Sequence, residues 1–191
     1  MKKALFWIGG ILGVVVLIIF LLVGYVVRIQ NNFVTMDEEV KGSWAQVENQ
    51  LQRRYDLIPN LVNTVKGFAA QEKSIFLGVA DARSKLAGAR TIDDKIAASR
   101  GMESAISRLL VISENYPQLK SDQNFIKLQD TLEGAENRLS VERKRYNDVV
   151  KVYNIELRKV PKGQLAQMLG FKPATFFQVE EAAKAAPKVT F

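Results

Sequence analysis

The sequence contains no cysteine and no histidine among its 191 residues. These absences exclude disulfides, a thiol nucleophile, an imidazole base and every metal site built from Cys or His ligands. No glycine-rich phosphate loop, Gly-x-Ser-x-Gly motif or isolated pair of carboxylates is present either. We therefore expect a protein that is not an enzyme and has no cofactor, no metal and no small-molecule substrate.

Proline and glycine are scarce, at 5 and 12 residues, which favours an ordered, helix-rich chain. The formal net charge is +7, and three of the positive charges belong to Lys2, Lys3 and Arg28. The others are spread among acidic residues. A nucleic-acid-binding surface would need clustered basic residues, so we expect no nucleic-acid partner and only weak attraction to anionic lipid head groups.

A stretch without any charged residue extends from Ala4 to Val27. It exceeds the roughly 20 residues that span a bilayer, and Trp7 and Tyr25 lie near its ends, where aromatic interface anchors occur. The apolar run is too long for a cleaved signal peptide, and no A-x-A-like cleavage site follows. The pattern predicts a short flank (1–3) and an uncleaved transmembrane signal anchor (4–27).

The charges beside this span predict its orientation in the cell membrane. Lys2 and Lys3 precede it, whereas Arg28 follows alone and three acidic residues come at 37–39. The positive-inside rule favours a cytoplasmic N-terminus and an extracytoplasmic domain. Gly9 and Gly13 have the G-xxx-G spacing with which spans pack closely, although glycine is common in membrane helices in any case.

A heptad pattern follows the span. Steps of four and three select Val40, Trp44, Val47, Leu51, Arg54, Ile58, Leu61, Val65, Phe68, Glu72, Ile75, Val79, Ala82 and Leu86. All but two are apolar, which predicts one long coiled-coil-like helix from Val40 to Leu86. Pro59 lies inside it without shifting the phase, so a kinked continuous helix is expected there.

Three further helices are expected. Thr91 and Asp94 form a capping box for a helix over 93–115, and a third helix, capped by Ser121 or Asp122, runs to Arg158. A short fourth helix over 164–169 ends at Gly170. The fold class is therefore all-α: a membrane helix, an antiparallel up-down bundle of three long helices with a short fourth (28–181) and a flexible tail (182–191). Because the second helix cannot cover the whole first stripe, we expect a homo-oligomer.

Residues 54–62, Arg-Tyr-Asp-Leu-Ile-Pro-Asn-Leu-Val, resemble the R-x-D-L-I-P-N-L-V signature of the LemA family of bacterial proteins. The similarity covers essentially the whole chain from about Gln30. It includes Trp44, Glu72, Ala82, Arg83, Glu114, Tyr116, Pro117, Glu136, Arg143, Tyr146, Asn147, Tyr153, Asn154, Phe171, Phe176, Pro187, Lys188 and Val189. Two positions differ, with Gln30 and Gln71 where the family often has Tyr and His.

The resemblance implies one N-terminal membrane helix and a helical domain without an established enzymatic activity. Relatives are linked to cell-envelope stress, to a membrane-embedded zinc protease of the heat-shock class and to the shaping of internal membranes in magnetosome-forming bacteria. The implied function is a membrane-anchored scaffold or adaptor for unidentified membrane proteins. The alternative is a homo-oligomer that remodels the lipid bilayer directly.

Charged residues of the signature interrupt the apolar stripes. The set comprises Arg54, Glu72 and Glu142 at heptad core positions, and Asp56, Arg83, Glu136 and Arg143 beside them. Buried charges are costly unless paired. We expect either an ionic network that fixes helix register, in which Arg54 pairs with Glu72 or Glu142 and Tyr146 and Asn147 satisfy leftover polar groups, or a groove that receives a partner's backbone.

A cluster of phenylalanines follows the heptad helices, at Phe171, Phe176 and Phe177. They either fold back to cap the bundle or form an exposed docking patch for lipid or protein.

Overall fold

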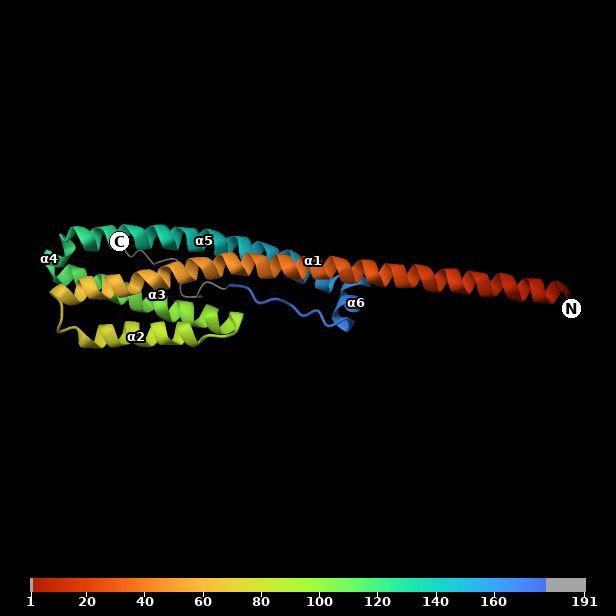
Figure 1. Cartoon of the computed structure of the whole chain (residues 1–191), viewed down its shortest axis with the longest axis horizontal. Helices are drawn as coiled ribbons and strands as arrows, with labels where there is room; N and C mark the ends of the chain where they lie inside the picture. Colours follow the sequence, from red (N-terminus) through yellow and green to blue (C-terminus); the bar gives the residue numbers. More distant parts are fainter. Residues whose placement is uncertain (1, 178–191) are drawn as a thin grey trace, which may run out of the picture. The chain divides into compact units, whose positions relative to one another are not determined.

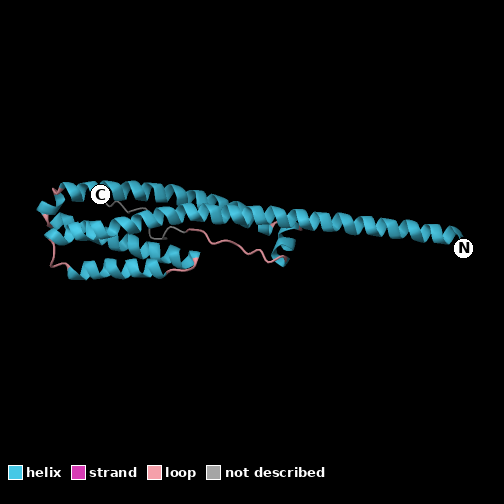
Figure 2. Cartoon of the chain, viewed as in Figure 1, coloured by secondary structure: helices cyan, strands magenta, loops and turns pink. Residues whose placement is uncertain are grey.

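The computed structural model describes residues 2–177, so the predicted tail (182–191) lies outside the described residues. All regular elements in the described part are helices (Figure 2). They are α1 (Lys2–Phe68), α2 (Lys73–Gly88), α3 (Ile92–Asn115), α4 (Pro117–Lys120), α5 (Gln123–Arg158) and α6 (Lys162–Met168). The predicted all-α class is confirmed.

Helix α1 contains the predicted span and continues as one helix of 67 residues through Pro59. Within the described part of the chain, it is the one helix long and apolar enough to cross a membrane. The apolar side chains of this stretch are not covered by the rest of the chain, and Phe20, for example, is 74% exposed. An uncovered apolar surface of this length fits a membrane-spanning segment.

The predicted single helix from Val40 to Leu86 is wrong. Helix α1 ends at Phe68, and Glu72, the residue before α2, has a non-helical ψ of 47°. The connection reverses the chain, so that α2 runs opposite to the end of α1, and a second turn after Gly88 lets α3 pack against α2 in the opposite direction (Figure 1). The reversal lets both halves of the stripe bury against one core, whereas a straight helix would leave its far end uncovered. The heptad phase persists because α1 and α2 face the same core.

The chain divides into two compact units. The second unit comprises residues 43–148 and the segment after Ala174. Its core is shared by α1, α2, α3, α4 and α5 and includes Ile58, Leu61, Val65, Phe76, Val79, Ala82, Met102, Ile106, Leu109, Ile112, Leu119, Phe125 and Leu132. This cluster contains Ile58 and Leu61 of the signature at residues 54–62, which explains why these two positions of the heptad stripe are apolar.

The first unit comprises residues up to Gly42 and residues 149–174. Its buried apolar side chains are Ile29, Phe33 and Val40 of α1, Val150, Tyr153 and Leu157 of α5, and Ala166 of α6. Gly163 permits the close approach of α6 to the end of α5, because a Cβ there would lie 2.2 Å from the Leu157 carbonyl oxygen.

The predicted helix ends agree closely with the structure. Thr91 and Asp94 form the capping box of α3, and the Asp122 carboxylate accepts a hydrogen bond from the Phe125 N–H at the start of α5, at 2.9 Å. Gly170 adopts a φ of +96° after α6, the left-handed conformation of a helix C-terminal cap.

Candidate functional site

Helix α5 carries the dipeptide Tyr-Asn twice, and each copy binds the main chain of the non-helical segment 171–177. In the second unit, the Tyr146 hydroxyl donates to the Thr175 carbonyl at 2.8 Å. The Asn147 side-chain amide donates to the Phe177 carbonyl at 2.9 Å and accepts from the Phe177 N–H at 2.7 Å. We call Tyr146 and Asn147 the Asn147 clamp. Its amide pairs with both main-chain groups of one residue, as a neighbouring β-strand would.

The first unit contains the equivalent Asn154 clamp, formed by Tyr153 and Asn154. The Tyr153 hydroxyl donates to the Lys172 carbonyl at 3.0 Å. The Asn154 amide donates to the Ala174 carbonyl at 2.8 Å and accepts from the Ala174 N–H at 2.9 Å. Both clamps thus use a hydroxyl on one carbonyl and an amide on the residue two positions later.

The repeat has a simple geometric basis. Moving seven residues along α5, from Tyr153 to Tyr146, moves the bound carbonyl three residues along the segment, from Lys172 to Thr175. Seven helical residues rise about 10.5 Å, and three extended residues span about 10 Å. A heptad repeat on a helix therefore keeps step with an extended main chain.

The Asn147 clamp is accompanied by an aromatic and cationic cage around Phe177. The Phe177 side chain is 3% exposed and stacks on Trp44 at a centroid distance of 6.4 Å. The Arg143 guanidinium lies 4.5 Å from the centre of the Phe177 ring. Trp44 in turn meets Tyr146 edge to face at 5.3 Å. The cage fixes one aromatic ring beside the main-chain clamp.

The three C-terminal phenylalanines do not form one exposed docking patch. Phe177 is buried, Phe171 is half-buried against Phe33 at a centroid distance of 5.6 Å, and Phe176 is 37% exposed. The difference arises because the clamps hold the main chain, which turns some side chains inward and others outward. For Phe177, the folded-back alternative describes the structure.

An ion network lies in the same unit as the cage. Arg54, which is 6% exposed, contacts the Glu136 carboxylate at 2.5 Å. Arg143 approaches the other oxygen of Glu136 at 3.4 Å and Glu103 at 3.7 Å. Burial lowers the pKa of Arg143 below its ordinary value, and the carboxylates of Glu136 and Glu103 oppose this effect. Glu136 thus connects the signature arginine to the arginine of the cage.

The predicted pairing of Arg54 with Glu72 or Glu142 is wrong. Between Arg54 and the end of α1 lie about 14 helical residues, or about 21 Å, so Glu72 is too far away. The Glu72 carboxylate accepts from the Tyr116 hydroxyl at 3.0 Å, and Glu142 pairs with Arg145 on the same helix at 3.0 Å.

The other predicted site residues have local partners. Asp56 accepts a hydrogen bond from Gln52 at 2.8 Å. The Arg83 guanidinium lies over the Tyr55 ring, 4.3 Å from its centre. The structure therefore brings together Arg54, Glu136 and Arg143, and places Asp56 and Arg83 in separate contacts.

Sequence reasoning missed Phe33 and gave Asn154 no role. Phe33 is fully buried and contacts Tyr153 edge to face at 6.3 Å. The signal that could have found Asn154 was the repetition of Tyr-Asn at a spacing of one heptad on a single helix.

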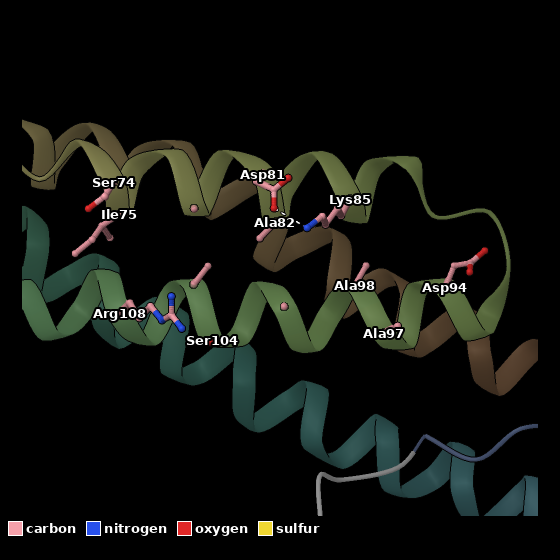
Figure 3. A pocket seen from close by; sticks show the side chains of 13 residues that line it. Ser74, Ile75, Asp81, Ala82, Lys85, Asp94, Ala97, Ala98, Ser104 and Arg108 are labelled. Atoms are coloured by element: carbon pink, nitrogen blue, oxygen red, sulfur yellow. Dashed lines mark ion pairs between the residues drawn. The ribbon is translucent and has the colours of Figure 1, made fainter.

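A groove of about 730 Å³ lies between α2 and α3 (Figure 3). Small residues, including Gly78, Ala82, Gly101 and Ala105, line it, and so do Asp81 and Lys85, which form an ion pair. It contains none of the predicted site residues. Within residues 2–177, no group of three or more Asp or Glu side chains is arranged to hold a metal ion.

Over residues 2–177, the fold and the clamps together define an all-helical class of protein with one candidate membrane span and a bound non-helical segment at 171–177. A family model described as "LemA family" matches residues 43–191, and the chain belongs to this family. It is 30% identical to magnetosome protein MamQ 2 of Paramagnetospirillum magneticum and 29% identical to magnetosome protein MamQ of Magnetospirillum gryphiswaldense. Each alignment covers 95% of this chain and 74% of the relative. The predicted family resemblance is confirmed.

Proposed function

We propose that this chain is a non-enzymatic, membrane-anchored scaffold or adaptor of the bacterial cell envelope that organises membrane-protein complexes. The observation that carries this proposal is the continuity of α1. One helix contains an uncovered apolar stretch of membrane-spanning length and, further on, the core residues Ile58 and Leu61. The apolar stretch and these core residues therefore belong to one helix. In this proposal, the second unit is an antiparallel up-down bundle.

The chemistry of the candidate site supports binding. The clamps present hydroxyl and amide groups that bind main-chain carbonyls and N–H groups, and the cage adds one ring contact. Such groups recognise protein segments. The partners in this proposal are membrane proteins, including membrane proteases that act in envelope stress, and the magnetosome names of two relatives support a membrane-associated role.

The test is crosslinking in native membranes, with a photoreactive residue placed at exposed Leu77 of the full-length chain. We expect repeated capture of the same few membrane proteins, identified by mass spectrometry. A matched control carries the photoreactive residue at Phe20 in the apolar stretch, which reports lipids and neighbouring spans. Capture of lipid alone from both positions would contradict the adaptor function.

The proposal includes a cytoplasmic N-terminus and an extracytoplasmic domain. Because the chain lacks cysteine, single cysteines replacing Lys3 and Lys188 can be labelled without background. A membrane-impermeant thiol reagent, applied to cells with a permeable outer membrane where there is one, should label only the second position. Labelling at Lys3 alone would reverse the orientation.

A second candidate function is membrane remodelling by a homo-oligomer, and the relatives named as magnetosome proteins favour it. The G-xxx-G spacing of Gly9 and Gly13 supports self-association, because small residues one helical turn apart let another span approach closely. Purified full-length chain in liposomes separates the two functions. Tubulation or vesiculation without a partner would favour remodelling and count against the adaptor.

A further inference from the structure

The Asn147 clamp and its cage recognise two features of their ligand. The first is a main chain, bound through the Thr175 carbonyl and through both the N–H and the carbonyl of Phe177. The second is the Phe177 ring, held between Trp44 and Arg143. All these groups belong to the second unit.

Little else of the segment is read. The Phe176 side chain is 37% exposed and is not one of the cage residues, and Thr175 is bound through its carbonyl. A main chain is common to all proteins, so an extended segment with an aromatic residue at the position of Phe177 satisfies every contact. A second copy of this chain carries that same segment.

We propose that the Asn147 clamp is a peptide-binding site that copies of this chain exchange, so that residues 175–177 of one copy occupy the clamp and cage of another. The exchange preserves each hydrogen bond and ring contact of the Asn147 clamp and cage. Because Ala174 directly precedes Thr175, the Asn154 clamp must release Lys172 and Ala174 when the segment moves to another copy. Anchoring in one bilayer brings copies together and raises their effective concentration. The adaptor proposal uses the same clamp for other proteins, but the two are tested separately, because self-capture and the capture of membrane proteins are different measurements.

A complementation experiment tests it with two full-length variants carrying different tags in mild detergent. Phe177→Ala keeps the clamp and cage but lacks the ring, whereas Asn147→Ala keeps the ring but lacks the amide. We expect each variant to capture itself at least about tenfold more weakly than the wild type does. Mixing the two should restore capture, because the intact clamp of the first accepts the intact segment of the second.

Phe176→Ala is the matched control, since that ring lies outside the cage, and it should capture itself as the wild type does. Unchanged self-capture by Phe177→Ala would overturn the proposal. So would failure of the mixture to recover when both variants retain the helical circular dichroism of the wild type.

A peptide experiment keeps the test independent of variant folding. A fluorescent decapeptide with the sequence of residues 170–179 is titrated into the wild-type full-length chain, and its anisotropy is measured. We expect saturable binding that weakens at least about tenfold with Phe177→Ala in the peptide and is unchanged with Phe176→Ala. Equal binding of the three peptides, or no binding of any of them, would contradict an exchangeable site.

Discussion

The two clamps on α5 make the same hydrogen bonds in different surroundings. The Asn154 clamp lies in a unit whose aromatic contacts join Phe33 to Tyr153 and Phe171. The Asn147 clamp lies beside a cage in which Arg143 is both a ring partner and a member of an ion network. Main-chain recognition is therefore generic, and the surrounding side chains determine what stabilises each clamp. Substitutions should therefore distinguish the Asn154 clamp, which apolar packing stabilises, from the Asn147 clamp, which an ion network stabilises.

Phe33→Ala should produce the largest effect and act on the apolar support. Truncation of a fully buried phenylalanine costs about 3–5 kcal/mol, and Phe33 is fully buried against Tyr153. We expect a loss of about 3 kcal/mol, measured by denaturant unfolding of the full-length chain in mild detergent. Hydrogen exchange at the Ala174 amide, which the Asn154 clamp holds, should accelerate.

Val34→Ala serves as its control, because Val34 is exposed and the substitution should change the free energy of unfolding by less than about 0.5 kcal/mol. An equal effect of the two substitutions would show that Phe33 does not support this clamp.

Arg54→Ala should have the next largest effect and act on the ionic support. Breaking a buried pair typically costs about 3–5 kcal/mol, but Glu136 is one-third exposed and water can solvate it after the loss of Arg54. We therefore expect a loss of about 2–3 kcal/mol in the same unfolding assay.

The double substitution Arg54→Met with Glu136→Leu should recover much of that stability, because no unpaired carboxylate remains. An unchanged unfolding midpoint for Arg54→Ala would show that the ion network does not stabilise the fold. Arg54 would then be assigned to a binding surface.

Much of the fold was predictable from local signals. The Thr91–Asp94 capping box, Asp122 and Gly170 each act within a few residues, so sequence alone located the ends of α3, α5 and α6. The reversal after Phe68 was not predictable in this way. Residues 69–72 are Ala-Ala-Gln-Glu, which contain neither glycine nor proline, and the heptad phase continues across them. The break lets α1 and α2 contribute to one common core, a long-range effect that the local sequence does not reveal.

The site was predictable in part. The signature charges pointed to Arg54, Glu136 and Arg143, which the structure brings together. Glu72 could have been excluded by helix rise alone, because about 21 Å of α1 follow Arg54 before that residue. Choosing Glu136 required knowing which residues of α5 lie beside Arg54. The role of Asn147 was less accessible still, because its ligand is the main chain of residue 177, thirty positions away. The repeated Tyr-Asn indicates a shared role for the two copies but does not identify the main chain that they bind.

Replacing the side-chain amide of either clamp by a carboxylate should have an intermediate effect on stability. The same substitution in both clamps allows a direct comparison between them. Asn147→Asp and Asn154→Asp keep the acceptor oxygen but replace the donor to the Phe177 or Ala174 carbonyl. We expect a loss of about 1–2 kcal/mol in each case, and faster hydrogen exchange at the Phe177 amide in the first variant and at the Ala174 amide in the second. If both variants accelerate both amides equally, the clamps act as one cooperative unit and the comparison fails.

Removal of the Tyr146 hydroxyl should have the smallest effect at neutral pH and a distinctive one in alkali. Burial raises the pKa of Tyr146 from about 10 to about 12, and the Asp93 carboxylate adds to the shift. Because the pKa is higher in the folded state than in the unfolded state, the stabilisation is fully present below about pH 10 and is lost as the pH rises towards 12.

Tyr146→Phe loses one hydrogen bond, to the Thr175 carbonyl, and should be about 1 kcal/mol less stable than the wild type at pH 8. It has no hydroxyl to ionise, so the difference should shrink with rising pH and change sign near pH 11, since one pKa unit corresponds to about 1.4 kcal/mol. Subtracting the two unfolding curves at each pH cancels the titration of all other groups that the substitution leaves unaltered. Parallel curves from pH 8 to 12 would show that the hydroxyl of the Asn147 clamp is not held in a buried, protonated state.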